Sequence, residues 1–334
     1  MVLWAVAAIL AAYTIIRLGG LERGTPLVQL VAFTPYAAPL ALLCAAGAAI
    51  AGATGPWLIC LLAWVSLSAT VVPRLIARPA PPTGGTGAKL RVMTANVLFD
   101  HGDMPALLQQ AKLDDIDVLA VQELTPAALD ALDTAGIDGL LPFRVAHPGR
   151  GGTGSALFSR HPLTPARDSG GVEGLARRHE CGMRQAGATI HVPAAGDTTL
   201  DVQVESVHPC APRPRQTRCW ARNLAAQPPA GSDPPRILLG DFNATLDHAP
   251  LRRLLRTGYR DAAGTRGRGL APTWPFKRGP GLPFVPPVTL DHVLADQRIG
   301  IGDVATRTIP GSDHRALLAQ LHLPRPTTHK GALH

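Results

Sequence analysis

The sequence predicts a mixed α/β domain, in which helices cover two packed sheets, behind a helical membrane region of about three spans. Three observations favour this fold class. Before residue 74 the only charged residues are Arg17, Glu22 and Arg23. A segment rich in Pro and Gly follows at residues 77–89. From residue 90 to residue 324, short apolar segments alternate with amphipathic ones, as in a layered α/β domain.

The N-terminal region, residues 1–76, contains three apolar runs, at about residues 1–16, 27–51 and 57–72. A spanning helix needs about 20 apolar residues, and the first run reaches Leu21 if Arg17 snorkels toward the bilayer surface. The stretch AGATGP at residues 51–56 is typical of a tight helical hairpin. A cleaved signal peptide followed by a hydrophobic domain is the alternative. The missing basic start and the two further apolar runs argue against it.

The linker at residues 77–89 is expected to be stiff and then flexible, and residues 325–334 are expected to form a loose tail. Of 32 Lys+Arg and 24 Asp+Glu, two and one respectively precede residue 74, which leaves a charge of +7 beyond it. This charge suits a nucleic acid, an anionic membrane surface or a polyphosphate substrate.

Within residues 90–324 we expect elements in the following order. Strands are predicted at residues 90–99, 117–124, 155–159, 183–192, 200–207, 236–240, 290–295 and 315–322. Helices are predicted at residues 104–115, 126–136, 215–226 and 248–257. In the first helix, Leu107, Leu108 and Leu113 are expected on the apolar side, and the second begins at Pro126 and stops at Gly136.

The five cysteines do not form a disulfide framework. Cys44 and Cys60 fall in apolar runs, where packing is the expected role. Cys181, Cys210 and Cys219 lie in the globular part without a C-x-x-C pair, which argues against zinc and leaves their pairing open.

Polar residues recur where the predicted strands end. They are Asn96, Glu123, His208, Asp241, Asn243, Asp291, Asp313 and His314. Each alone is explained by a turn, a helix start or a structural histidine. Together, acids, amides and imidazoles at six strand ends predict a Mg²⁺ site where water attacks phosphorus, because Mg²⁺ prefers hard oxygen ligands and substrate phosphate.

The order of motifs resembles that of the endonuclease/exonuclease/phosphatase superfamily, which has the deoxyribonuclease I-like fold. The matching segments are TANV, VQE, GSALFSRHPL, GDFNAT, LDHVL and GSDHRAL, within about residues 90–323. The resemblance implies a four-layer α-β-β-α sandwich and a metal-dependent phosphohydrolase.

The resemblance also implies roles for the strand-end residues. Glu123 corresponds to the principal metal ligand, with Asn96 and, directly or through water, Asp313. The implied ion is Mg²⁺, with Mn²⁺ as the alternative.

The remaining residues are implied to be catalytic. Asp241 would orient or deprotonate the attacking water, and Asn243 would hold a phosphate oxygen. His314 would contact the scissile phosphate, with Asp291 orienting it, and His208 would lie near the leaving group.

An apolar helical region before such a domain is similar to the membrane-anchored bacterial members, including the VanJ-type teicoplanin-resistance proteins. This implies hydrolysis of a lipid-linked phosphate or pyrophosphate, such as undecaprenyl pyrophosphate in cell-wall metabolism or glycopeptide resistance. It also implies a multi-pass protein of the cell membrane with an extracytoplasmic catalytic domain. The arginines at residues 17, 23, 74 and 78, taken by the positive-inside rule, predict the opposite side.

Two other functions remain open. One is a membrane-tethered nuclease acting on DNA or RNA, and the other is a non-catalytic scaffold that binds cell-wall lipid. Arg213, Arg215 and Arg218 would grip a second phosphate or remain solvated. The motif-free histidines and both Trp220 and Trp274 are expected to be structural. Those histidines are His101, His147, His161, His179, His191 and His248.

Overall fold

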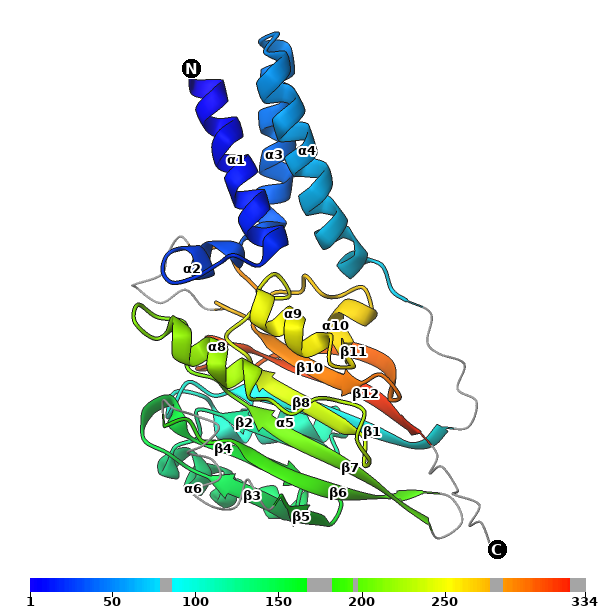
Figure 1. Ribbon diagram of the computed structural model, residues 1–334. Helices are drawn as coiled ribbons and strands as arrows, with labels where there is room; N and C mark the ends of the chain where they lie inside the picture. The colour runs from blue at the N-terminus through cyan, green and yellow to red at the C-terminus, as the bar shows by residue number, and fades with distance from the viewer. Residues whose placement is uncertain (79–85, 167–181, 195–197, 277–284, 325–334) are drawn as a thin grey trace, which may run out of the picture.

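The protein has a bundle of N-terminal helices standing on one end of an α/β domain (Figure 1). This computed structural model describes residues 1–78, 86–166, 182–194, 198–276 and 285–324. Cys181 and His179 lie outside the described residues.

The bundle consists of apolar helices. They are α1 (Val2–Gly19), α2 (Leu27–Val31), α3 (Thr34–Ile50), α4 (Thr54–Val71) and the 3₁₀ turn η1 (Val72–Leu75). In the described part of the chain, α1 and the segment Thr54–Leu75 are long and apolar enough to cross a membrane, a property that buried core helices share. The second predicted apolar run is divided, since α2 is separate from the 17-residue α3. α3 and α4 form the predicted hairpin around residues 51–53.

The domain contains two six-stranded mixed sheets. The first has the order β11-β12-β1-β2-β4-β3, and the second has the order β5-β6-β7-β8-β10-β9. The first sheet consists of β1 (Thr86–Asn96), β2 (Val118–Gln122), β3 (Phe143–His147), β4 (Ser155–Ser159), β11 (Gly300–Thr308) and β12 (Arg315–Pro324). The second consists of β5 (Leu163–Pro165), β6 (Ala186–Ala194), β7 (Thr198–Val207), β8 (Arg236–Asp241), β9 (Tyr259–Asp261) and β10 (Asp291–Asp296). Within each sheet one pair is parallel, β1 with β2 and β7 with β8.

Helices cover the outer face of each sheet. They are α5 (Met104–Leu113), α6 (Pro126–Thr134), α8 (Thr217–Ala225) and α9 (Ala249–Leu255), with the short turn η2 (Ile137–Gly139). The short helix α10 (Ala262–Thr265) instead contributes Ala262 and Ala263 to the core between the sheets, and the turn η3 (Gly151–Thr153) lies beside Glu123. α5 and α6 contribute Leu107 and Leu132 to a core against the first sheet. α8 and α9 contribute Trp220 and Leu251 to a core against the second. The resulting four-layer α-β-β-α sandwich confirms the predicted fold class.

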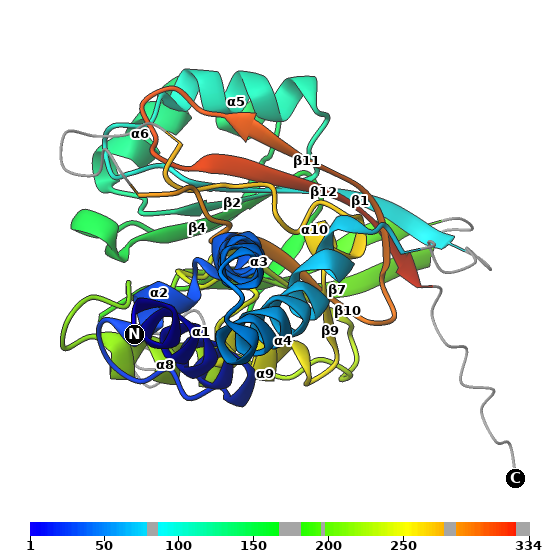
Figure 2. The same cartoon turned by 90° about the horizontal axis from the view of Figure 1, so that it is seen from above.

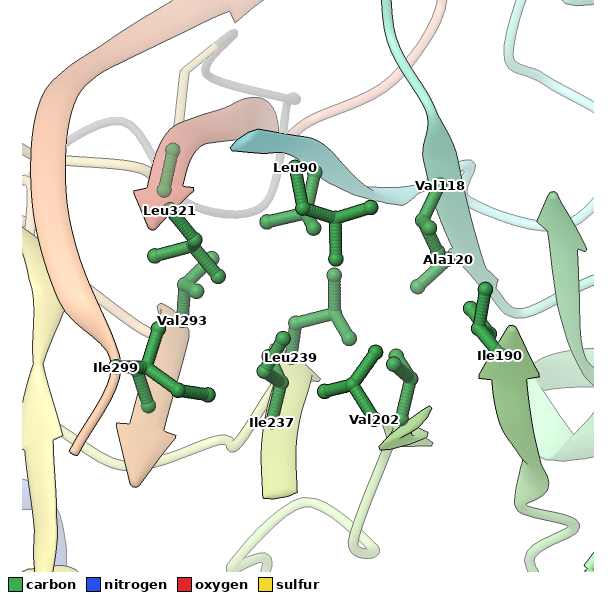
Figure 3. Close-up of a cluster of buried hydrophobic side chains, with 14 of the residues drawn as sticks. Leu90, Val118, Ala120, Ile190, Val202, Ile237, Leu239, Val293, Ile299 and Leu321 are labelled. Atoms are coloured by element: carbon green, nitrogen blue, oxygen red, sulfur yellow. The ribbon is translucent and has the colours of Figure 1, made fainter. Parts of the chain in front are cut away.

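The largest core lies between the sheets. Figure 3 shows Leu90, Val118 and Leu321 of the first sheet facing Val202 and Leu239 of the second. All five side chains are completely buried. Because side chains alternate along a strand, this core turns the other residues of β1, β2 and β8 toward the helices.

The predicted elements differ from the structure mainly at sheet edges. β1 begins at Thr86, inside the segment predicted as linker. Leu113, predicted on the apolar side of α5, is 72% exposed, because α5 ends there. Four strands had no prediction, namely β3, β5, β9 and β11. All four lie at a sheet edge, where polar side chains weaken the apolar pattern, and β5 and β9 have three residues each.

The N-terminal bundle is bonded to the domain through Asp247, whose side chain is fully buried. Asp247 Oδ1 accepts from Arg17 Nε and Arg74 Nη2, both at 2.7 Å, and Asp247 Oδ2 accepts from Arg74 Nη1 at 2.8 Å. Figure 2, seen from above, shows α1 and α4 on the side of the domain that carries α9. α1 and the turn η1 therefore share one carboxylate of the domain.

Candidate active site

The topology brings the polar strand ends to one place. Parallel strands end at the same edge, so β1 and β2 deliver Asn96 and the residue after Gln122 side by side. β10 runs antiparallel to β8, and its first residue, Asp291, pairs with the last residue of β8, Asp241. β12 runs antiparallel to β1, so its start also lies at this edge.

Asn96 links the two sheets at the site. Its Nδ2 donates to Glu123 Oε1 at 3.1 Å and to Asp241 Oδ2 at 3.0 Å. Its Oδ1 accepts from the Leu98 amide at 3.0 Å, which fixes the orientation of the carboxamide. Asn96 thereby holds a carboxylate from each sheet with one amide group.

Glu123 follows β2 directly and has a φ of +60°. Burial raises the pKa of Glu123 to about 7, with the charges of Asp241 and Asp313 adding to the effect and Asn96 and His314 opposing it. This clustering of carboxylates is costly without a cation, because like charges disfavour ionisation.

His314 and Asp291 form a buried pair. His314 Nδ1 lies 2.8 Å from Asp291 Oδ2, and His314 Nε2 lies 3.7 Å from Asp241 Oδ2. Burial alone would lower the pKa of His314, but the carboxylates of Asp291 and Asp241 outweigh it and raise that pKa to about 10. The two carboxylates therefore favour the charged form of His314, whose Nε2 is directed toward Asp241.

His208, after β7, faces the same carboxylates with the opposite electrostatic result. Its Nε2 lies 3.7 Å from Glu123 Oε1 and 3.6 Å from Asp241 Oδ2. Burial lowers the pKa of His208, although Asp241 opposes this shift. Burial also raises the pKa of Asp241, which His314 and His208 partly offset. Two imidazoles with opposite pKa shifts thus approach the same oxygen, Asp241 Oδ2.

Asn243 has a φ of +48°, a conformation that Asn tolerates better than most residues. Its amide donates to Asp241 Oδ1 at 2.8 Å, and its Nδ2 donates to Pro209 O at 3.1 Å. The turn joins the end of β8 to the loop that carries His208.

Asp313 is held by a residue whose role the sequence did not reveal. Trp274 Nε1 donates to Asp313 Oδ2 at 3.0 Å, and the Trp274 ring lies 6.4 Å from the His314 ring. Trp274 was predicted to be a packing residue, and no motif surrounds it that indicates another role. Trp220, in contrast, is buried and donates to Phe242 O.

A second set of unpredicted residues supports the site from behind. Gln122 accepts from Thr94 Oγ1 at 3.0 Å and donates to Ser206 Oγ at 2.9 Å, while Ser155 Oγ lies 2.8 Å from Ser206 Oγ. The four side chains are fully buried. In the sequence, these residues are visible only as polar residues within apolar strands. Their hydrogen bonds connect the two sheets next to Glu123.

The donor set suits a hard divalent cation. Among the described residues, Glu123 Oε2, Asp291 Oδ1 and Asp313 Oδ1 are buried oxygen atoms without a hydrogen-bond partner. Asp241, Asp291 and His314 also form a group whose ligand atoms lie within 4.8 Å of one another. Carboxylate and amide oxygens bind ions of the Mg²⁺ class, so the residues fit a divalent metal. The predicted ligands Asn96, Glu123 and Asp313 adjoin this group rather than coincide with it.

Contacts join the eight predicted site residues into one cluster. The three arginines predicted near His208 are not part of it. Arg213, Arg215 and Arg218 are exposed on the loop and helix after His208. His248, predicted as structural, is buried, and its Nε2 lies 2.8 Å from Val28 O of α2.

Solved structures with this fold are similar to most of the chain. One is a humanized D. rerio TDP2 with 14 mutations, 16% identical, with a TM-score of 0.52, covering 70% of this chain and 99% of that one. Another is a functionally unknown conserved protein from Enterococcus faecalis V583, 14% identical, with a TM-score of 0.50 and coverage of 70% and 100%. A third is an endonuclease/exonuclease/phosphatase from Bacteroides vulgatus, 13% identical, with a TM-score of 0.50 and coverage of 71% and 100%. These likenesses show the fold.

The sequence comparisons are consistent with this fold. No curated protein matches the chain. The model of the endonuclease/exonuclease/phosphatase family matches residues 93–314, which is most of the domain and includes all eight site residues. The chain therefore belongs to the endonuclease/exonuclease/phosphatase family.

Proposed function

We propose that this protein is a membrane-anchored, Mg²⁺-dependent phosphohydrolase that acts on a lipid-linked phosphate or pyrophosphate. Family membership supports hydrolysis of a phosphoester in general. The proposal adds three points to family membership, namely attachment to a membrane, dependence on Mg²⁺ and a lipid-linked substrate.

One observation carries the choice of substrate: the apolar bundle is docked on the loops that flank the site. Gln29 of α2 donates to Pro212 O, in the loop that begins at His208. On the other side, Tyr36 of α3 donates to Pro287 O at 2.7 Å, and the adjacent Val288 bridges to Trp274. A site held this close to apolar helices suits a phosphate that is itself held at a bilayer surface.

The side chains support an in-line attack of water on phosphorus. Asp241 is placed to orient the water and accept its proton, and burial, which raises the pKa of Asp241, makes this carboxylate a stronger base. His314 is placed to donate from Nε2 to a phosphoryl oxygen, because Asp291 keeps its imidazole charged. The new bond joins the water oxygen to phosphorus, and the ester or anhydride oxygen leaves.

Asn243 and His208 complete the arrangement. The second N–H of the Asn243 carboxamide is placed to hold a phosphate oxygen while the first bonds Pro209 O. His208 lies close to Glu123 and Asp241 and would contact the leaving oxygen. Two imidazoles with opposite pKa shifts permit two different roles in one site.

A divalent ion would be held by Glu123 with Asn96 and Asp313, and Glu123 Oε2 and Asp313 Oδ1 have no hydrogen-bond partner among the described residues. Bound there, it would neutralise charge on the phosphate during the reaction.

Purified full-length protein in detergent, assayed with Mg²⁺ on an isoprenoid pyrophosphate such as undecaprenyl pyrophosphate, tests the proposal. We expect phosphate release that EDTA abolishes and that Asp241→Asn reduces by about 10² to 10⁴-fold. Asp303→Asn, at an exposed carboxylate of β11, is the matched control and should retain activity. Robust cleavage of DNA without phosphate release from the lipid would contradict the proposal.

A tethered nuclease is the second candidate, and the exposed Arg213, Arg215 and Arg218 beside the His208 loop favour it. Binding of DNA or RNA would then weaken steeply with salt, because phosphate contacts release counterions. An affinity that is flat between low and moderate salt would exclude it. A non-catalytic lipid-binding scaffold would show no activity that depends on Asp241.

We further propose that the domain is extracytoplasmic, by similarity to the VanJ-type proteins, and that it has access to cell-wall lipid carriers. Alkaline phosphatase fused after residue 324 should be active, and green fluorescent protein fused there should be dark. The reverse pattern would place the domain in the cytoplasm.

A further inference from the structure

A cavity of about 670 Å³ lies where the N-terminal bundle meets the domain. One wall is the end of α1, and a second is the end of α4 with η1. The third wall is α9 with the chain that follows it to residue 265. None of the eight site residues lines this cavity, so it is separate from the catalytic cluster.

The lining of the cavity is strongly basic. Seven arginines line it: Arg17, Arg74, Arg78, Arg252, Arg253, Arg256 and Arg260. The one lining carboxylate, Asp261, is already occupied, because its Oδ2 accepts from His292 Nδ1 at 2.9 Å and its Oδ1 accepts from the Gly264 amide at 2.6 Å. Asp261 therefore contributes little compensation toward the cavity.

Most of the arginines lack a carboxylate partner. Arg17 and Arg74 are neutralised in part by Asp247. Arg252 donates to the backbone oxygens of Asp247 and Arg17. Arg253 and Arg256 are exposed, and neither forms an ion pair with a residue in the described ranges.

The environment of Arg260 is independent evidence that positive charges lie close together at this cavity. Its Nη2 donates to Gln297 O and Ile299 O, but its Nε is buried without a hydrogen-bond partner among the described residues. Burial lowers the pKa of Arg260, and the charge of Arg78 lowers it further, with the charge of Asp296 opposing them in part. An anion in the cavity would relieve this repulsion and offer an acceptor to the guanidinium group.

We propose that this cavity binds the phosphate of an anionic phospholipid headgroup. Guanidinium forks bind phosphate oxygens in pairs, which suits a cavity lined by arginines. The proposal goes beyond the catalytic proposal, since it concerns a second phosphate site that needs no hydrolysis.

The position of the cavity identifies a lipid as the source of the phosphate. α1 has 18 residues and is therefore about 27 Å long, close to the roughly 30 Å of a bilayer core. Both α1 and α4 end at the cavity, so if they span the membrane the cavity lies at the level of the headgroups. Leu18, an exposed apolar residue at its rim, would contact the acyl region.

Titrating phosphatidylglycerol into the detergent-purified full chain, with retained lipid counted by native mass spectrometry, tests this site. We expect Arg253→Ala/Arg256→Ala to weaken binding about 30-fold, which corresponds to about 2 kcal/mol for two surface cations. Lys89→Ala/Lys112→Ala removes the same charge from exposed residues of β1 and α5, and should bind as the unmodified chain does. Arg253→Lys/Arg256→Lys keeps the charge but loses the forks, so its affinity should fall between those of the unmodified chain and the alanine variant, which separates lost charge from lost folding.

Three results would overturn the site as proposed. Equal loss in the lysine control would mean that only overall charge matters. Equal affinity for zwitterionic phosphatidylcholine would mean that anionic headgroups are not selected. Displacement of phosphatidylglycerol by equimolar inorganic pyrophosphate would point to a soluble anion instead. Asp241→Asn should bind the lipid normally, so failure of the catalytic proposal would not alter this measurement.

Discussion

At the scale of single residues, the site depends on two histidines whose pKa values are shifted in opposite directions. His208 and His314 are both buried and both approach Asp241 within 4 Å. The pKa of His208 is lowered because burial dominates, whereas the pKa of His314 is raised because Asp291 adds a direct bond to its Nδ1. One carboxylate, Asp291, therefore decides which imidazole is charged.

Asp291→Asn should shift the alkaline limb of the pH–rate profile to lower pH. The pKa of His314 is raised to about 10, so its imidazolium persists at neutral pH and is lost as pH rises through that value. Without the Asp291 charge, burial favours the neutral ring at lower pH. The measurement is kcat/KM against pH at saturating metal. An unchanged limb would mean that His314 titration does not control it.

Trp274→Phe should weaken metal binding while leaving chemistry at saturating metal nearly unchanged. Trp274 donates to Asp313 Oδ2, and loss of such an outer hydrogen bond typically costs 10 to 100-fold in metal affinity. The readout is the Mg²⁺ concentration that gives half-maximal activity. A large fall in kcat that excess metal does not restore would assign Trp274 a different role.

At the scale of elements, β7 and β8 leave no room for a side chain at Gly240, beside the site. Gly240, the residue before Asp241, would place a Cβ atom 1.9 Å from Val207 O and 2.9 Å from Val207 N. Since those atoms belong to the paired backbone of β7, the strands would have to separate to admit a side chain. His208 follows Val207, so the same contact sets the spacing of His208 and Asp241.

Gly240→Ala should destabilise the protein by at least about 3 kcal/mol, at the upper end of single substitutions. In a domain of this size that lowers Tm by roughly 6 °C or more. Gly231→Ala is the matched control, because Gly231 also has a positive φ, +95°, but no atom within 4 Å of an added Cβ. Equal losses in the two variants would show that backbone conformation, rather than the contact, is responsible.

Some elements and site residues could be predicted from the sequence and others could not, for a physical reason. Asn96, Glu123 and Asp241 could be predicted because each lies at, or directly after, the end of an apolar strand, which is a local pattern. The strand β3 could not, because its edge position weakens the apolar pattern. The role of Trp274 could not, because its evidence is a partner far along the chain. Trp274 is 39 residues from Asp313, and nothing near Trp274 indicates that contact.

At the scale of the whole molecule, several contacts hold the N-terminal bundle against the domain. Besides the Asp247 pairs, Glu22 accepts from the Ala249 amide at the start of α9. Val28 of α2 belongs to the same core as Trp220 and Phe242. The segment that carries Asp241 and Asn243 thus also carries, through Asp247, the attachment of the helices.

Asp247→Asn should destabilise the full chain by about 3 to 5 kcal/mol, because it leaves two buried guanidinium groups without their charge partner. Burial raises the pKa of Asp247, but Arg74 and Arg17 outweigh it, and the net pKa is lowered. A lowered folded-state pKa stabilises the protein above the unfolded value, and this contribution is lost as pH falls through the folded value.

Thermal unfolding of both proteins between pH 3 and pH 7 checks this. The unmodified chain should lose more Tm than Asp247→Asn on acidification, so the two curves converge. Parallel curves would show that the Asp247 pairs add little to stability.

The separation of these partners along the chain has a consequence for biosynthesis. Arg17 precedes Asp247 by 230 residues, and Arg74 precedes it by 173. At about 5 to 20 residues per second, the ribosome supplies Asp247 roughly 10 to 50 s after Arg17. If the helices enter a bilayer, both arginines are free cations while orientation is decided, and they pair only after it is fixed. The positive charges of Arg17 and Arg74 that influence orientation during membrane insertion are therefore paired with Asp247 in the folded protein.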